Sequence, residues 1–133
     1  MELKTNTQRL MQTLESLGQI GNGPQGLHRL AFGNEDIQAR RYIVTLMEEA
    51  NLETTVDPAG NLIGRWKGSK PDLPTIAVGS HTDTVPNAGK YDGALGVLGA
   101  IECCKTLKDR NIRPRHTIEV INFTNEEGTR YHR

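Results

Sequence analysis

The chain contains the stretch Thr75-Ile-Ala-Val-Gly-Ser-His-Thr-Asp-Thr84, which passes from apolar to polar residues near its centre. The short apolar run over residues 75–80 predicts a strand that is buried on both faces. His81 follows this run directly. We therefore expect His81 at the carboxyl end of a buried strand.

The next two segments predict how this strand is connected. Residues 93–108 carry apolar side chains at helical spacing, and Gly96 and Gly99 would let this helix approach a sheet closely. Residues 117–124 again predict a strand. Strand, helix and strand in this order predict a right-handed parallel crossover, so both strands end at the same edge of one sheet, where open α/β sheets bind ligands. We also expect the strand over 117–124 to leave an unpaired sheet edge.

The first part of the chain predicts helices and a hairpin. The segments are a helix over 5–17, a loop over 18–33, a helix over 35–50, and a hairpin with strands over 52–56 and 62–66. Gly18 is placed to end the first helix, and Asn34 is a favourable N-cap for the second. The predicted fold class is α/β, with a mostly parallel sheet flanked by helices.

Length and composition limit the classes of function. A chain of 133 residues is long enough for one domain or part of one. Lys and Arg together number 16, as do Asp and Glu, so no net charge favours nucleic acid or a membrane surface as partner. No run approaches the roughly 18 apolar residues of a membrane span. We expect a soluble, cytoplasmic protein that acts on a small molecule.

The polar residues that follow the two strands suit metal chemistry. His81 and Asp83 are two positions apart, so they point to the same side in extended backbone, and Asp83 can accept a hydrogen bond from the imidazole of His81. A loop returns Asp92 to the same edge, and its two oxygens can bridge two cations. Glu127 can bind the second cation, while Glu126 can act as the general base.

Each of these residues also has an ordinary structural interpretation. A histidine after a strand is commonly just hydrogen-bonded, an aspartate at a helix start is commonly a cap, and a Glu-Glu pair is commonly solvated. Their joint placement at one predicted edge favours a metal-assisted hydrolase. His28, His116 and His132 have no partner motif, and the sequence has no nucleophile elbow and no phosphate-binding glycine-lysine loop.

Three ordered motifs carry a family resemblance. They are Gly79-Ser-His-Thr-Asp-Thr-Val-Pro86, Gly89-Lys-Tyr-Asp-Gly-Ala-Leu-Gly-Val97 and Phe123-Thr-Asn-Glu-Glu-Gly-Thr-Arg-Tyr131. With these motifs the chain resembles the amidase, hydantoinase and carbamoylase branch of the M20 metallopeptidase-like family. That branch includes N-carbamoyl-L-amino acid hydrolases and allantoate amidohydrolases.

The resemblance implies a role for each residue of the site. His81, Asp92 and Glu127 would be metal ligands, with Asp92 bridging two divalent ions such as zinc, manganese, cobalt or nickel. Glu126 would be the general base, and Asp83 would orient His81. The resemblance also implies hydrolysis of a linear carbamoyl or ureido C–N bond in a small-molecule substrate, and a homodimeric full-length parent with an inserted dimerisation domain.

The chain departs from the family in its length. Family members are much longer, and further histidine ligands lie beyond the positions present here, so each ion would have only Asp92 and one other ligand instead of the three expected of a catalytic site. We expect residues 1–133 to be the N-terminal part of a di-metal catalytic domain, inactive alone. Two alternatives remain: a dipeptidase or aminopeptidase of the same superfamily, and a non-catalytic α/β remnant that acts as an interaction module.

Overall fold

The computed structural model describes residues 2–131, and its first helix is α1 (Thr7–Gly18). The side chain of Asn6 caps this helix by accepting a hydrogen bond from the Arg9 backbone N–H at 3.0 Å. The helix predicted over 5–17 is confirmed with shifted ends, and Gly18 is its last residue. Leu14 and Leu17 are buried, and α1 packs against α3 (Ala94–Asp109).

The second helix, α2 (Asn34–Glu49), begins differently from the prediction. Gly33, not Asn34, is the N-cap residue, and no side chain of the cap itself bonds to the helix. The Asp36 carboxylate reaches back instead and accepts from the Phe32 backbone N–H at 3.0 Å. The helix therefore starts one residue earlier than predicted, with Asn34 as its first residue.

The predicted hairpin is confirmed as β3 (Glu53–Val56) paired antiparallel with β4 (Leu62–Trp66). The carboxylate of Asp57 organises its turn, because it accepts from the backbone N–H groups of Ala59 and Asn61, both at 2.9 Å.

The predicted crossover is also confirmed. Strand β5 (Ile76–His81) leads through α3 to β6 (Ile118–Phe123), and the two strands are parallel, with His81 opposite Phe123. The sheet order is β3-β4-β6-β5, so the α/β class is confirmed, although the sheet is mixed and not mostly parallel.

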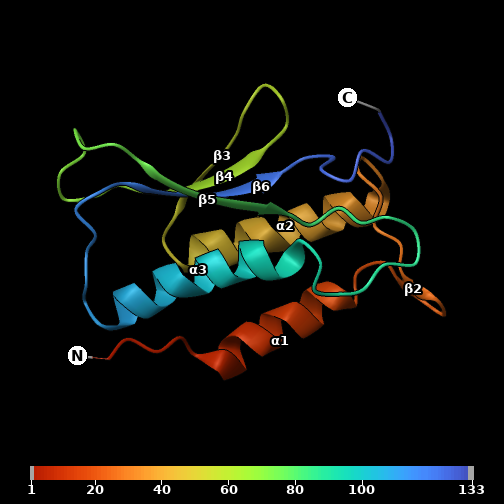
Figure 1. Cartoon of the computed structure of the whole chain (residues 1–133), viewed down its shortest axis with the longest axis horizontal. Coiled ribbons are helices and arrows are strands. Elements are labelled where there is room, and N and C mark those ends of the chain that lie inside the picture. The colour runs from red at the N-terminus through yellow and green to blue at the C-terminus, as the bar shows by residue number, and fades with distance from the viewer. Residues whose placement is uncertain (1, 132–133) are drawn as a thin grey trace.

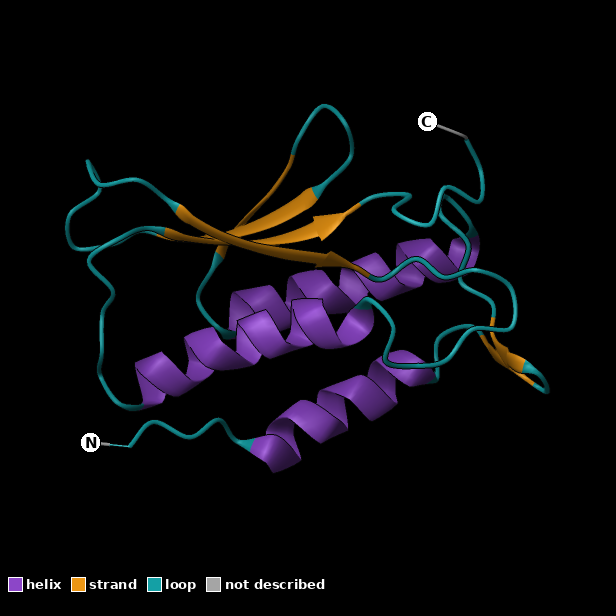
Figure 2. Cartoon of the chain, in the orientation of Figure 1, coloured by secondary structure: helices purple, strands orange, loops and turns teal. Residues whose placement is uncertain are grey.

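Two expectations about the strands are wrong. Strand β6 lies inside the sheet between β4 and β5, so the edge belongs to β5. Strand β5 is not buried on both faces, since Ile76 is 48% exposed and Val78 43%. The reason is visible in Figures 1 and 2, where the helices all lie on one side of the sheet and leave its other face open.

Helix α3 packs against β5 and β6, and α2 packs against β3 and β4 (Figure 1). Gly96 permits this approach, because a Cβ there would lie 2.6 Å from the Cβ of Ser80. Gly99 faces open space, so its predicted packing role is wrong. The core between the sheet and the helices is apolar, and its fully buried members include Ile43, Met47, Val97 and Val120.

The segment predicted as a plain loop contains a short antiparallel pair, β1 (Asn22–Gly23) and β2 (Gly26–Leu27). Leu27 exchanges backbone hydrogen bonds with Ala88 at 2.8 and 2.9 Å, which ties this pair to the loop that precedes α3. No helix among residues 2–131 is long and apolar enough to cross a membrane.

Candidate metal centre

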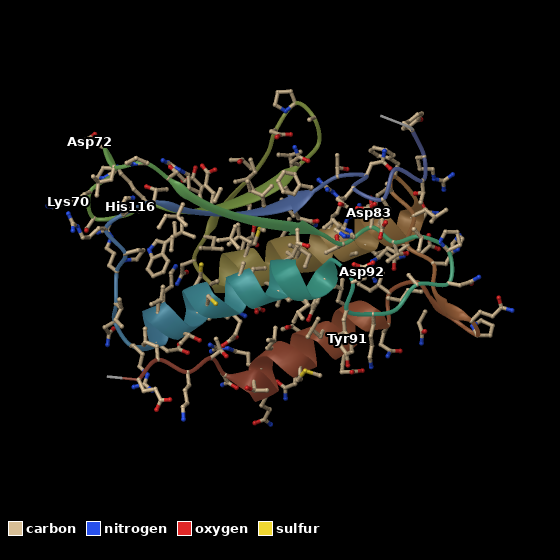
Figure 3. All side chains as sticks on the ribbon, in the orientation of Figure 1. Lys70, Asp72, Asp83, Tyr91, Asp92 and His116 are labelled. Carbon is tan, nitrogen blue, oxygen red and sulfur yellow. The ribbon has the colours of Figure 1, made fainter. Side chains whose placement is uncertain are left out.

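The carboxyl ends of β5 and β6 bring distant polar residues to one edge of the sheet. His81 is the last residue of β5, and Thr82, Asp83 and Thr84 behind it are all buried. Asp92 precedes α3, and Figure 3 shows Asp83 and Asp92 at the same end of the molecule. The chain turns after β6 through Asn125, which has a positive φ of 52°.

Three predicted residues meet at this edge. Ligand atoms of His81, Asp92 and Glu127 all lie within 4.8 Å of one another. The His81 side chain is buried, Glu127 is half-buried and Asp92 is exposed. Glu126 lies beside them, with its Oε2 atom 3.4 Å from Nε2 of His81. The candidate metal centre is defined here as His81, Asp92, Glu126 and Glu127.

The orientation of the His81 ring can be assigned from its hydrogen bond. Nδ1 lies 3.0 Å from the backbone carbonyl oxygen of Asp83. A carbonyl oxygen only accepts, so Nδ1 must carry the hydrogen, and in the neutral ring Nε2 then keeps the lone pair. The nitrogen left for a cation therefore faces Glu126.

Asp83 contacts His81 through a different atom from the one expected. Its carboxylate is 3.7 Å from Nδ1, farther than its own carbonyl oxygen. The carboxylate instead accepts from the backbone N–H groups of Glu126 at 3.2 Å and Glu127 at 3.1 Å. Asp83 thus holds the turn that carries both glutamates, a role that residue spacing cannot reveal because the turn is distant in sequence.

Gly93 is a residue that the site requires and that sequence reasoning passed over. Its φ is 69°, and a Cβ there would lie 2.5 Å from Nε2 and 2.6 Å from Nδ1 of His81. No side chain fits at that distance, so only glycine lets the start of α3 lie against the imidazole. The Asp92-Gly93 pair was the available sequence signal.

Without a bound cation, it is unfavourable for all the carboxylates of the site to be charged at once. Burial raises the pKa of Glu127, and the negative charges of Asp92, Glu126 and Asp83 add to this effect, against an opposing contribution from His81. A bound cation would remove this repulsion.

Within residues 2–131, the other histidines are not part of this group. His28 is exposed. His116 contacts the carbonyl oxygen of Pro74 at 2.6 Å and lies at the opposite end of the sheet from Asp83 and Asp92 (Figure 3). His132 lies outside the described residues.

The donor set fits a divalent cation. One imidazole nitrogen and two carboxylates are ligands that zinc and related metals take in proteins. Since the ligand atoms of His81, Asp92 and Glu127 already lie close together, this group could hold a metal ion.

Comparisons with known proteins point in the same direction. The chain is 40% identical to a ureidoglycolate hydrolase of Arabidopsis thaliana over 97% of its own length and 27% of that protein. It is 44% identical to an N-carbamoyl-L-amino acid amidohydrolase of Geobacillus stearothermophilus over 93% of the chain and 31% of that protein. The crystal structure of a hydantoinase/carbamoylase family amidase from Burkholderia ambifaria superposes with a TM-score of 0.94 at 35% identity, covering 96% of this chain and 32% of that one.

The chain thus spans between 27% and 32% of the length of these relatives. Residues 61–131, which are more than half of the chain and contain all four residues of the candidate metal centre, match peptidase family M28. The motifs resemble M20-type amidases, and the relatives carry amidase and hydrolase names, while the matching family is M28. The chain therefore belongs to peptidase family M28, and the resemblance to amidases of the hydantoinase/carbamoylase type that its motifs predict is confirmed.

Proposed function

We propose that this chain is part of a metal-dependent amidohydrolase that cleaves a linear carbamoyl or ureido C–N bond in a small molecule. The observation that carries the proposal is the convergence of His81, Asp92 and Glu127 within 4.8 Å, from the end of β5, the loop before α3 and the turn after β6. The names of the relatives support the substrate class, because they act on ureidoglycolate and N-carbamoyl amino acids.

In this proposal two divalent ions, zinc, manganese, cobalt or nickel, are held at the candidate metal centre. His81 would contribute its Nε2 lone pair, Glu127 would contribute a carboxylate oxygen, and Asp92 would be the ligand that the two ions share. Such ions, when bound, polarise a carbonyl group and make water a stronger acid.

Glu126 is the group proposed to accept the proton of the attacking water. Its side chain is 50% exposed and lies next to His81, yet it is not one of the three residues whose ligand atoms converge. This geometry supports a division of labour in which Glu127 binds and Glu126 acts as base. General-base catalysis of this kind contributes about 10²- to 10⁴-fold to rate.

We further propose that the chain corresponds to the N-terminal part of a catalytic domain. Its coverage of 27% to 32% of these relatives supports its being part of a longer protein, while the N-terminal placement rests on the family resemblance of its motifs. Further ligands, the groups that select the substrate and a dimerisation domain would then come from outside residues 1–133.

The test is a chimera in which this chain replaces the stretch that it matches in the Geobacillus amidohydrolase. We expect turnover of N-carbamoyl amino acids, because this chain would supply its share of the metal ligands while the Geobacillus part supplies the groups that select the substrate. Glu126→Gln should lower kcat at least about 100-fold while metal content, measured by elemental analysis, stays unchanged. Glu119→Gln, on β6 away from the site, is the matched control and should behave as the unmodified chimera.

Two results would contradict the proposal. Full turnover in the Glu126→Gln chimera would remove the general base from the mechanism. A chimera that does not turn over N-carbamoyl amino acids would show that this chain cannot supply its share of an amidohydrolase site.

A further inference from the structure

Arg29 is a buried cation that is not one of the four residues of the candidate metal centre. It lies in the segment between β2 and α2, and its relative exposure is 1%. A guanidinium is rarely buried so completely, because removing its charge from water is costly unless its donors are all satisfied. Its position beside the site therefore calls for a reason.

Within the described residues, the side chain of Arg29 donates its hydrogen bonds to backbone carbonyl groups. Nε donates to the Thr82 carbonyl at 2.8 Å, and Nη1 donates to the carbonyls of Leu17 at 2.9 Å and Ile20 at 2.8 Å. Leu17 lies in the last turn of α1 and Ile20 lies two residues beyond its end, so the guanidinium is close to the helix C-terminus, where a cation is favourable. The planar guanidinium thus joins the end of α1 to the segment that follows β5.

The backbone of Arg29 contacts the same segment two residues farther on. Its N–H donates to the hydroxyl of Thr84 at 2.9 Å, and its carbonyl accepts from the Thr84 N–H at 2.8 Å. Arg29 therefore holds the residues on both sides of Asp83. Through its carbonyl and carboxylate, Asp83 in turn contacts His81 and the backbone of Glu126 and Glu127.

Charge supports the same arrangement. Within residues 2–131, Arg29 forms no ion pair, and the charges that act on it are those of Asp36 and Asp83. Burial lowers the pKa of Arg29, and these two carboxylates oppose that shift. An arginine keeps its proton in proteins, so Arg29 provides a fixed positive charge behind the acidic site.

We propose that Arg29 is a positioning residue for the candidate metal centre. It fixes the path of residues 82–84, which keeps the His81 ring and the Glu126–Glu127 turn at a spacing that suits a cation. This inference rests on the proposed metal-binding function of His81, Asp92 and Glu127.

The experiment measures Zn²⁺ and Mn²⁺ binding to the whole chain by isothermal titration calorimetry, at a temperature where circular dichroism shows each variant folded. Arg29→Met should weaken metal binding about 10- to 100-fold, as loss of residues that orient ligands does. Arg29→Lys should restore part of this affinity, because lysine keeps the charge but not the planar fork. Arg9→Met, which removes a buried guanidinium contact far from the site, is the matched control and should bind metal as the wild type does.

A second measurement is independent of metal. In the metal-free chain, long-range ¹H–¹⁵N spectra of the imidazoles should show His81 with its hydrogen on Nδ1, and Arg29→Met should give a mixture of tautomers. If Arg29→Met does not fold, Thr84→Val takes its place, because it removes the acceptor of the Arg29 N–H; it should weaken metal binding about fivefold.

The outcomes separate the two proposals. The positioning role is overturned if Arg29→Met keeps the wild-type metal affinity and an unchanged His81 tautomer, and the metal centre then stands without it. Where Thr84→Val replaces Arg29→Met, the same result in that variant overturns the role. If His81→Ala binds metal as well as the wild type, the metal centre itself fails and the positioning role falls with it. If the wild-type chain alone binds no metal, the His81 tautomer in Arg29→Met decides the positioning role, because further metal ligands are expected outside residues 1–133.

Discussion

One cluster of polar side chains lies near the start of α3 and another lies along its second half, and the two differ in how their charge is balanced. The interior cluster, defined as Asn6, Arg9, Glu102 and Thr106, surrounds a carboxylate that is 3% exposed. Glu102 accepts from the Arg9 guanidinium at 2.7 and 2.8 Å, from the Asn6 backbone at 3.0 Å and from the Thr106 hydroxyl at 3.1 Å. Every charge in this cluster has its partner within the chain.

The candidate metal centre has the opposite balance. Among residues 2–131, neither Asp92 nor Glu127 forms an ion pair with a lysine or arginine. The pKa shifts differ accordingly. Burial would raise the pKa of Glu102, but the hydrogen bonds from Arg9, Asn6 and Thr106 outweigh it and lower that pKa, whereas the pKa of Glu127 is raised. Removing one partner from a buried ionic cluster is destabilising, while carboxylates that have no cationic partner are suited to bind a cation.

The largest expected effect concerns the candidate metal centre, whose carboxylates lack a cationic partner in the part of the chain that the structure describes. Gly93→Ala would place a Cβ 2.5 Å from Nε2 of His81, so either the imidazole or the start of α3 must shift and the spacing of the ligand atoms changes. We expect metal affinity, measured by calorimetry with Zn²⁺, to fall about 100-fold. Gly89→Ala is the control, since nothing lies within 4 Å of a Cβ there, and equal affinities in the two variants would contradict the geometry.

The next effect concerns the interior cluster, in which the Glu102 carboxylate is paired with Arg9. Arg9→Met leaves Glu102 buried without its guanidinium, and we expect the free energy of unfolding in urea to fall by about 2–3 kcal/mol. Metal affinity should not change. Arg65→Met, which breaks a partly exposed pair with Glu119 at 3.6 Å, should cost less than about 1 kcal/mol. A similar loss in both variants would mean that burial of the Arg9–Glu102 pair is not important.

Acid should act through the interior cluster. Because the pKa of Glu102 is lower in the folded state than its ordinary value of 4.5, its charged form contributes stability above that value, and this contribution is lost as the pH falls through the folded pKa. We expect the free energy of unfolding to decline between about pH 5 and pH 3. In Glu102→Gln this decline should be shallower, and an unchanged slope would argue against the role of Glu102.

The smallest expected effect concerns the helix that connects the two groups. Gly99→Ala should stabilise α3 by about 0.5–1 kcal/mol, because alanine favours a helix and a Cβ there meets nothing within 4 Å. Gly96→Ala should destabilise the chain instead, since its Cβ would lie 2.6 Å from Ser80. Thermal unfolding measures both, and effects of the same sign would contradict the described packing of α3 on β5.

Much of the fold could be predicted from local patterns. The apolar run before His81, the helical stripe of α3 and the turn residues of the β3–β4 hairpin each act within a few positions, and all three elements are found where they were predicted. Because a parallel crossover has one favoured hand, these elements also predicted that His81, Asp92 and Glu127 would meet at one edge.

The tertiary structure decided what depends on contacts between distant segments. Three features have no signature in the local sequence. They are the edge position of β5, the contact of Gly93 with the His81 ring, and the hydrogen bonds of Arg29 to Thr82 and Thr84. The Asp83 carboxylate likewise reaches a turn more than forty positions away. Side-chain periodicity determines which face of an element is apolar, whereas hydrogen-bond partners depend on how the elements pack, so the sequence determined the donor set and only the packed fold determined what holds it in place.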